Sequence, residues 1–142
     1  MTPVNYRLPT CYCEEGRKFE LEEFAEENLR ARLNTKIGPF FVCKVNRELA
    51  GVVITKYDAG LLWIDWVVTR EKFLRKGIAK TLVELAIYQA EKAGCHKAWC
   101  DTVTGNITSL RFFQALGFST AVTLRNHWYN QDFVLLIRDI AK

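Results

Sequence analysis

The sequence predicts a mixed α/β fold with α+β character, built on one sheet that contains some parallel pairing. Two observations support this class. The middle of the 142-residue chain alternates strand, helix, strand and helix, and runs of strand lie on both sides of that middle. Because parallel strands need a crossover between them, segments 61–68, 78–93 and 97–103 are expected to form one right-handed strand–helix–strand unit. A ligand is then expected at the carboxyl end of strand 61–68.

Seven segments are expected to be strands, at 4–8, 40–45, 49–56, 61–68, 97–103, 118–124 and 132–139. The second and third flank a short Asn46-Arg47-Glu48 turn, which predicts a strand pair. The fourth is rich in tryptophan and β-branched residues, which strands favour. A polar and aromatic segment, 125–131, joins the last two.

Three helices are expected at 19–33, 78–93 and 106–116. In the first two, apolar residues recur at helical spacing. Gly94 and Gly117 stand where the second and third helices should end, and glycine commonly ends a helix. The first helix has a second face of glutamates. That face would suit a cationic acceptor such as a polyamine or a basic peptide, and it would equally suit plain solvation.

The composition predicts a single domain over residues 1–142 and a soluble, cytoplasmic protein. Hydrophobic residues make up 49% of the chain, enough for one packed core. No apolar run is long enough to cross a bilayer, and residues 1–10 lack the layout of a signal peptide. The net charge of +4 suits an anionic ligand, but no basic run is interleaved with aromatic residues as in a nucleic-acid groove. We therefore expect no membrane or nucleic-acid partner.

The five cysteines are expected to be reduced thiols rather than metal ligands. Their number is odd, and none forms a C-x-x-C pair. Cys11 and Cys13 flank a single residue, which is poor spacing for zinc. We therefore expect no metal, and whether any cysteine has a function stays open.

The residues around Gly77 form the first candidate site. A strand, a polar stretch and a long apolar helix follow one another there. The first N–H groups of a helix have no partner within it, and together with the helix dipole they attract anions. Gly77 would let the backbone approach a phosphate, Arg75 and Lys76 add positive charge, and Lys80 or Thr81 could add side-chain donors. The pattern is neither a Walker loop nor a dinucleotide-binding fingerprint, and alone it is common.

A second stretch, 106–118, lies about 30 residues downstream. Asn106 suits the N-cap of a helix. Its amide, or the Ser109 hydroxyl, could hydrogen-bond a ligand that carries amides. Phe112, Phe113 and the Leu-Gly-Phe ending would pack this short helix tightly onto the sheet.

Together the two stretches resemble motifs A and B of the GNAT superfamily of N-acetyltransferases. Residues 63–82 resemble motif A, which usually ends R/Q-x-x-G-x-G/A, and residues 106–118 resemble motif B, of the N-x-x-A-x-x-F-Y-x-x-x-G-F type. The resemblance implies the GNAT fold: a central mixed, mostly antiparallel sheet, flanked by helices and splayed between two parallel strands, here 61–68 and 97–103. It also implies that acetyl-CoA, without a metal, acetylates a primary amine of a small molecule or peptide by direct attack in a ternary complex.

The resemblance further implies which residues bind acetyl-CoA. The pantetheine arm would run along the strand residues Trp66, Val67 and Val68. The pyrophosphate would be held by the backbone amides of Arg75, Lys76, Gly77, Ile78 and Ala79, with Lys80 and Thr81 beside them. Asn106 and Ser109 would face the pantetheine or the adenosine, and Phe112 would pack near the thioester.

Two residues depart from the family pattern. Leu74 stands where the family prefers arginine or glutamine, so one side-chain contact is lost unless Arg75 supplies it. Phe113 stands where many relatives carry a tyrosine that protonates the departing thiolate, and phenylalanine has no proton to donate. The second departure leaves an alternative open, a non-catalytic CoA-binding or sensory module.

Acetyl transfer also needs a base that removes a proton from the amine. Asp65 interrupts the apolar strand 61–68 and is the first candidate, the plainer alternative being a solvent-facing carboxylate. Histidine can exchange a proton near neutral pH, which makes His127 the second candidate, and Tyr129 could replace the missing tyrosine as the acid. Both belong to a segment that often shapes the acceptor pocket in this family, and Asp101 is a further option for the base. The identity of the acceptor stays open, as does the oligomeric state, although an exposed last strand would allow a homodimer.

Overall fold

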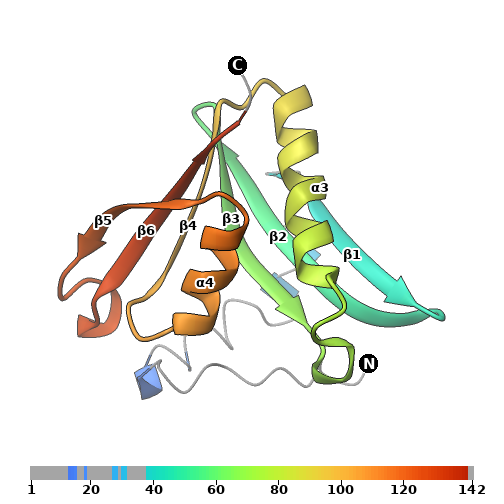
Figure 1. Cartoon of the computed structure of the whole chain (residues 1–142), viewed down its shortest axis with the longest axis horizontal. Helices are drawn as coiled ribbons and strands as arrows, with labels where there is room; N and C mark the ends of the chain where they lie inside the picture. The colour runs from blue at the N-terminus through green and yellow to red at the C-terminus, as the bar shows by residue number, and fades with distance from the viewer. Residues whose placement is uncertain (1–12, 16–17, 19–26, 29, 32–37, 141–142) are drawn as a thin grey trace. The chain divides into compact units, whose positions relative to one another are not determined.

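The computed structural model describes residues 13–15, 18, 27–28, 30–31 and 38–140 (Figure 1). Its elements are, in order, β1 (Phe40–Val45), β2 (Glu48–Asp58), β3 (Leu61–Thr69), η1 (Glu71–Phe73), α3 (Ile78–Lys92), β4 (Lys97–Val103), α4 (Ile107–Ala115), β5 (Ser119–Leu124), η2 (Trp128–Asn130) and β6 (Phe133–Asp139). The predicted strand 4–8 lies outside the described residues. So does most of the predicted helix 19–33, of which residues 27–28 and 30–31 are described and are helical.

The six strands form a mixed sheet in the order β1-β2-β3-β4-β6-β5, with one parallel pair. The mixed α/β class predicted from the sequence is confirmed. Backbone contacts divide the chain into two compact units. The first holds the described residues 38–98 and 139–140, and the second holds residues 99–138 with the described residues between 13 and 31. Organisation as a single domain over residues 1–142 stays a prediction.

In the first unit, β1, β2 and β3 form an antiparallel meander, and α3 packs on it (Figure 1). Gly51 of β2 lies beneath the first turns of α3. A Cβ added to Gly51 would come within 2.9 Å of Ile78 Cγ2 and 3.2 Å of Leu82 Cδ1. Glycine at this position therefore lets the beginning of α3 lie close to the sheet. The apolar side of α3 is buried at helical spacing, through Ile78, Leu82, Val83, Ala86, Ile87 and Ala90.

In the second unit, β5 and β6 form an antiparallel hairpin, and α4 precedes β5. Phe113 of α4 and Phe118 are both buried and meet edge to face, with ring centroids 5.2 Å apart. The Arg138 guanidinium donates a hydrogen bond to the Leu116 carbonyl, with 3.0 Å between Nη1 and O. Ring packing and a charged donor thus hold the C-terminal end of α4, where a cation also suits the helix dipole.

Most predicted boundaries are confirmed to within a few residues, and two features differ. The short turns η1 and η2 were not expected from the sequence. The strand β2 begins at Glu48, which the sequence placed in the turn. Asn46 and Arg47 both adopt positive φ, so two residues suffice to close the hairpin. Glu48 is therefore free to pair with Val45 as the first residue of β2.

Candidate functional site

Gly77 is the residue that precedes α3, and its backbone is left-handed, with φ 75° and ψ 12°. Only glycine enters this region without steric cost. A Cβ built on Gly77 would meet no atom of the described structure within 4 Å. The backbone angle, rather than crowding by neighbouring side chains, therefore requires glycine here, and the space in front of the turn is open to a ligand.

The first turn of α3 presents backbone amides that the helix itself does not use. The first intrahelical hydrogen bond runs from the Thr81 N–H to the Gly77 carbonyl over 3.0 Å, so the amides of Ile78, Ala79 and Lys80 precede it. Within the described residues, no side chain caps the start of α3, and the first turn of this helix carries no acidic residue. The Thr81 hydroxyl donates to the Gly77 carbonyl over 2.9 Å, which fixes its hydrogen inside the turn. The amides, together with the helix dipole, suit an anion.

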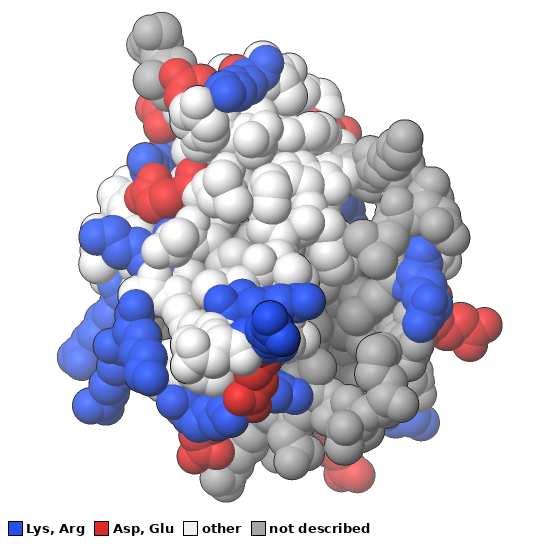
Figure 2. All heavy atoms as spheres, turned by 90° about the vertical axis from the view of Figure 1, so that its right-hand side faces the viewer, with Lys and Arg blue, Asp and Glu red and all other residues white. Residues whose placement is uncertain are grey.

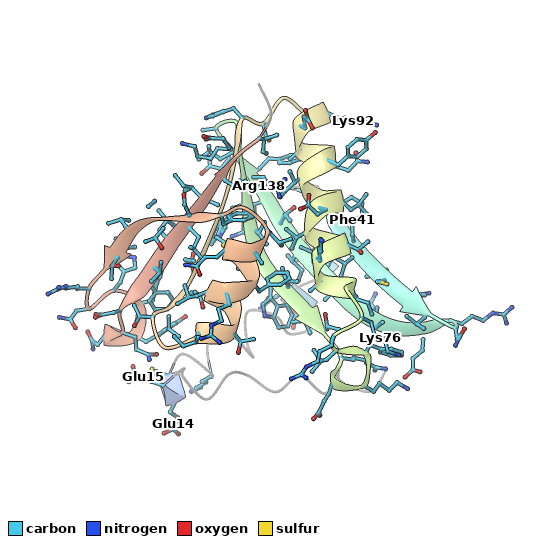
Figure 3. All side chains as sticks on the ribbon, in the orientation of Figure 1. Glu14, Glu15, Phe41, Lys76, Lys92 and Arg138 are labelled. Carbon is cyan, nitrogen blue, oxygen red and sulfur yellow. The ribbon has the colours of Figure 1, made fainter. Side chains whose placement is uncertain are left out.

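Basic side chains surround this turn. Arg75, Lys76 and Lys80 are exposed, and Lys76 belongs to the segment that leads into α3 (Figure 3). Figure 2 shows Lys and Arg gathered on the lower part of one face, at the height of η1 and the start of α3 in Figure 1. Exposed cations raise the local concentration of an anionic ligand, so charge and backbone geometry favour the same class of ligand.

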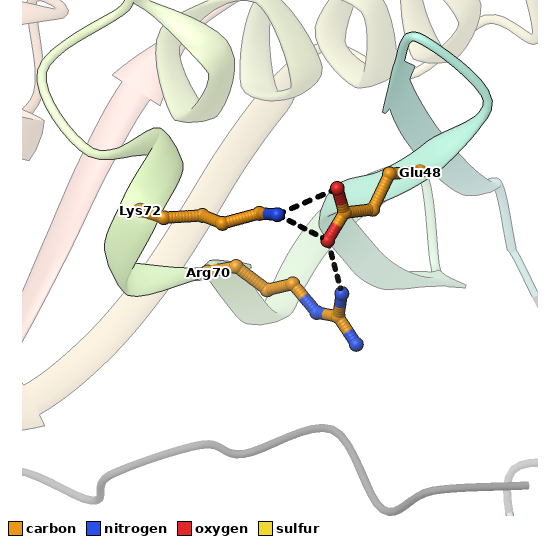
Figure 4. Close-up of polar contacts among 3 residues, drawn as sticks. All are labelled: Glu48, Arg70 and Lys72. Carbon is orange, nitrogen blue, oxygen red and sulfur yellow. Dashed lines mark hydrogen bonds and ion pairs between the residues drawn. The ribbon is translucent and has the colours of Figure 1, made fainter.

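The segment between β3 and α3 is tied to the β1–β2 hairpin by Glu48. Lys72 Nζ lies 2.6 Å from both carboxylate oxygens of Glu48, and Arg70 Nη1 lies 3.2 Å from Oε1 (Figure 4). The hydrogen bond from Lys72 lowers the pKa of Glu48, with a further contribution from Arg70. The Arg70 N–H donates to the Ala50 carbonyl over 2.8 Å, and Phe73 is buried. These contacts fix the segment that carries the Gly77 turn.

The strand β3 contains a bulge at the proposed base. The consecutive β2 residues Ile54 and Thr55 align with Trp66 and Ile64, so Asp65 is the extra residue of β3. Bulges are frequent next to active sites because they change the direction of a side chain. The Asp65 side chain is 13% exposed, and its Oδ2 lies 3.6 Å from Lys56 Nζ. Asp65 is therefore mostly buried and ion-paired, which differs from the solvent-facing alternative drawn from the sequence.

The residues expected along the pantetheine arm continue β3 beyond that bulge. Trp66 and Val67 are half-buried, and the Val68 side chain is 5% exposed. Val67 and Val68 align with Val53 and Val52 of β2. With its side chain buried, Val68 can meet a ligand only through its backbone, in keeping with the expected backbone pairing.

The helix α4 begins as the sequence predicts. The Asn106 side-chain oxygen accepts a hydrogen bond from the Ser109 N–H over 3.2 Å, which makes Asn106 the N-cap. Phe112 is half-buried and meets the Phe113 ring edge to face, with centroids 5.0 Å apart. Phe113 is 7% exposed. The Asn106 oxygen is thus engaged within the helix, and its amide N–H groups are the donors left for a ligand.

The β5–β6 loop holds the other two catalytic candidates, His127 and Tyr129. Tyr129 has φ 58° and Asn130 has φ 54°, a conformation uncommon for residues other than glycine. The His127 N–H donates to the Gln131 carbonyl over 2.9 Å, and the Gln131 N–H donates to the Trp128 carbonyl over 3.0 Å. His127 is exposed and Tyr129 is half-buried. Hydrogen bonds therefore hold the loop in a strained form, as is common where a side chain must be placed for function.

An N-terminal residue contacts the same loop. The Cys13 N–H donates to Gln131 Oε1 over 2.9 Å, and the Cys13 thiol lies 3.9 Å from the Tyr129 carbonyl oxygen. Sequence reasoning did not find this contact, because the partners are 118 and 116 residues apart. It also missed the Glu48 cluster, for which the only signal was an acidic residue beside a tight turn.

The buried cysteines are poor candidates for chemistry. Burial raises the pKa of the Cys95 and Cys100 thiols, and Asp101 raises that of Cys100 further. A thiol is a nucleophile only as the thiolate, so both are inert near neutral pH. Within the described ranges, no group of three or more His, Cys, Asp and Glu residues could hold a metal ion. The helices in those ranges also include none with the length and apolar character to cross a bilayer.

The predicted site residues fall into separate groups in the structure. Residues 66–68 and 75–81 belong to one continuous part of the first unit, at the end of β3 and the start of α3. Asn106, Ser109 and Phe112 belong to α4 in the second unit, and His127 and Tyr129 to its β5–β6 loop. The first group alone forms a recognisable anion-binding turn.

Comparison with known proteins gives related sequences. The family model described as the acetyltransferase (GNAT) family matches residues 6–118. N-alpha-acetyltransferase 30 of Dictyostelium discoideum is 29% identical over 102 residues, which covers 68% of this chain and 55% of the relative. The ribosomal protein bS18-alanine N-acetyltransferase of Escherichia coli (strain K12) is 24% identical over 87 residues, which covers 61% of this chain and 59% of the relative. The chain therefore spans little more than half the length of these relatives.

Solved structures share the fold. The ribosomal-protein-S18-alanine N-acetyltransferase from Escherichia coli superposes with a TM-score of 0.74 at 20% identity, covering 83% of this chain and 79% of that one. A Bacillus subtilis acetyltransferase in complex with CoA gives a TM-score of 0.72 at 21% identity, covering 95% and 97% of the two chains. The family match includes both the Gly77 turn and the helix α4. The chain thus belongs to the GNAT family of acetyltransferases.

Proposed function

We propose that this chain is an N-acetyltransferase that uses acetyl-CoA as co-substrate and acetylates a primary amine. One observation carries the proposal. The first turn of α3 offers amides that the helix does not use, with open space in front of Gly77 and exposed cations at Arg75, Lys76 and Lys80. Such a turn suits a pyrophosphate group. Membership of the GNAT family, and the CoA bound to the similar Bacillus subtilis structure, support CoA as the ligand.

In this proposal the cofactor lies along the end of β3 and the start of α3. The β3 backbone at Trp66, Val67 and Val68 pairs with the pantetheine arm. The amides of residues 75–79 hold the pyrophosphate, and Lys80 and Thr81 lie at its rim. The α4 residues Asn106, Ser109 and Phe112 keep the roles toward pantetheine, adenosine and thioester that the family resemblance implies.

The reaction needs two proton transfers. The amine nitrogen attacks the thioester carbonyl carbon, a C–N bond forms, the C–S bond breaks, and the CoA sulfur leaves as a thiolate. A base takes the proton that the amine releases, and we propose Asp65 or His127 for that role. An acid returns a proton to the thiolate, and we propose Tyr129, because the phenyl ring of Phe113 has none to give.

We propose a peptide or protein amine as the acceptor. Two curated relatives have names that describe acetylation of an alanine of a ribosomal protein and N-alpha acetylation. These names favour an acceptor of this kind over a polyamine or another small amine. A cytoplasmic location stays a prediction, which cell fractionation would check. The last strand, β6, lies between β4 and β5 rather than at an exposed edge, so the homodimer loses its sequence-based reason and stays a prediction for light scattering on the purified chain.

The test combines binding with turnover. Purified chain should show a rise in melting temperature with CoA at millimolar concentration, and it should release thiol when acetyl-CoA meets a suitable peptide. Mass spectrometry of the peptide should locate the acetyl group on the amine. A chain that fails to bind CoA would contradict the cofactor assignment. Binding without turnover across broad panels of peptides and small amines would favour the non-catalytic CoA-binding module that Phe113 leaves open.

A further inference from the structure

We propose that Glu48 is a positioning residue for the cofactor: it binds Arg70 and Lys72, and so holds the β3–α3 segment in the form that receives the pyrophosphate. The inference rests on the proposed use of acetyl-CoA. Glu48 itself contacts no part of the cofactor in this view. It acts only through the segment that ends at Gly77.

The contacts join parts of the chain that are distant in sequence. Glu48 is the first residue of β2, Arg70 follows β3, and Lys72 lies in η1, so the pairs are 22 and 24 residues apart. Figure 4 shows both cations converging on the one carboxylate, with Lys72 reaching both oxygens. Salt bridges at a surface are worth little singly, but a shared carboxylate restrains two side chains at once.

The segment needs such a restraint because the residues that follow it are exposed and include one strained residue, Arg75, beside the left-handed Gly77. Arg75 has φ 62°, and Gly77 has φ 75°. Apart from the Glu48 pairs, the Arg70 N–H bond to Ala50, the buried Phe73 ring and two hydrogen bonds inside η1 help to fix the segment. Among the described contacts, only the Lys76 ammonium, 5.6 Å from the centroid of the Phe73 ring, links the turn residues to this anchored part. Loosening η1 would lower the fraction of molecules whose amides are ready for the pyrophosphate, and apparent affinity falls in proportion to that fraction.

The distribution of charge supports the same role. Glu48 engages Arg70 and Lys72, which leaves the exposed side chains of Arg75, Lys76 and Lys80 around the turn. A positioning role and a plain electrostatic role predict opposite changes in CoA affinity when Glu48 loses its charge. If only the field mattered, removing a negative charge near an anion site would tighten CoA binding. If positioning matters, the same change weakens it.

The experiment measures the Kd of CoA and of dephospho-CoA by calorimetry for wild type, Glu48→Gln and Glu71→Gln. Glu71 is the matched control, because it is an exposed carboxylate in η1 with no ion pair in the part of the chain that the structure describes. We expect Glu48→Gln to weaken the binding of both ligands by about two- to fivefold, the modest effect that the loss of an exposed ion pair allows. Glu71→Gln should leave both affinities equal to wild type or slightly tighter.

A second variant shows whether Glu48 acts through Lys72. Lys72→Gln breaks one of the two contacts of Glu48 and should also weaken the binding of CoA, and the double variant should lose no more affinity than Glu48→Gln alone, since that change already breaks the shared contact. The inference is overturned if Glu48→Gln behaves like Glu71→Gln, or if it tightens binding. It is also overturned if its loss is confined to CoA, because Arg70 and Lys72 would then contact the 3′-phosphate that dephospho-CoA lacks. If wild type binds neither ligand, the proposed function fails and this inference with it.

Discussion

Exchange of Gly77 for alanine separates the backbone role of this residue from its role toward the cofactor. Gly77 and Gly94 precede and follow the same helix, α3, with φ 75° and 86°. A Cβ at either position would meet no described atom within 4 Å. Both substitutions therefore place an L-residue in the left-handed region without a clash, at a cost of about 1–2 kcal/mol each. Gly94→Ala is thus a matched control for Gly77→Ala.

The two variants should lose similar stability and differ in cofactor binding. In a domain of this size, 1 kcal/mol shifts the melting temperature by about 4 °C, so each variant should melt about 4–8 °C below wild type. The alanine methyl at Gly77 would occupy the open space where the pyrophosphate is expected. Loss of one hydrogen bond to a charged group is worth about 1.5–3 kcal/mol, so CoA should bind about tenfold or more weakly to Gly77→Ala. Gly94→Ala should bind CoA with wild-type affinity.

Calorimetric titration measures the affinity for CoA, and thermal melts of the unliganded chains measure the stability separately. Equal CoA affinity in Gly77→Ala and Gly94→Ala would refute the placement of the pyrophosphate at this turn. A stability loss in Gly77→Ala that exceeds the loss in Gly94→Ala by more than about 2 kcal/mol would mean that the two glycines do not carry equal backbone costs.

Three further changes test other parts of the structure. Gly51→Ala should lower the free energy of unfolding in urea by about 1–3 kcal/mol, because its Cβ would lie 2.9 Å from the Val68 carbonyl oxygen, and it should weaken CoA binding by displacing the start of α3. Tyr129→Phe should lower kcat by about 10²-fold and leave the KM for acetyl-CoA unchanged, as measured by thiol release. The hydrogen bond from Lys72 lowers the pKa of Glu48 below its ordinary value of 4.5. The ionised Glu48 carboxylate therefore stabilises the fold fully above pH 4.5, and this stabilisation is lost as the pH falls through the lower pKa of the folded state. The difference in melting temperature between wild type and Glu48→Gln should therefore shrink in acid.

Each of these predictions has a result that contradicts it. Wild-type stability and CoA affinity in Gly51→Ala would mean that α3 can move away from β2 at no cost. Tyr88→Phe is the control for Tyr129→Phe, since Tyr88 is 52% exposed on α3 and has no proposed role. Equal kcat values in the two variants would exclude Tyr129 as the acid. A melting difference for Glu48→Gln that stays unchanged even when the carboxylate is fully protonated in acid would mean that this difference does not come from the ionised form of Glu48.

Local patterns in the sequence predicted the elements of the fold well. The ends of α3 follow from Gly77 and Gly94, because a left-handed residue is a local requirement that glycine meets. The Asn106 cap and the Gly117 stop likewise depend on neighbours within a few residues, and the structure confirms both. The β1–β2 turn was placed correctly except for Glu48, since turn length depends on the φ angles of two residues that composition does not reveal.

Contacts between distant parts of the chain were not predicted. The bulge at Asp65 adds one residue to β3, and regular alternation in a strand gives no sign of such an insertion. The contacts of Cys13 with the β5–β6 loop join residues more than 100 positions apart. The catalytic candidates Asp65, His127 and Tyr129 therefore stay predictions, because their roles depend on how each meets the thioester rather than on the local pattern around it.

The sequence by itself determined the family, the mixed α/β class and the glycine turn before α3. Each of these depends on local patterns: helical periodicity, a glycine at the start of a helix, and two motifs about 30 residues apart. The tertiary structure alone decided that Gly51 sets the distance from β2 to α3, and that Glu48 holds Arg70 and Lys72. The reason is physical: side-chain packing and ion pairs depend on which surfaces meet after folding, whereas turns and helix ends depend on the backbone angles of a few adjacent residues.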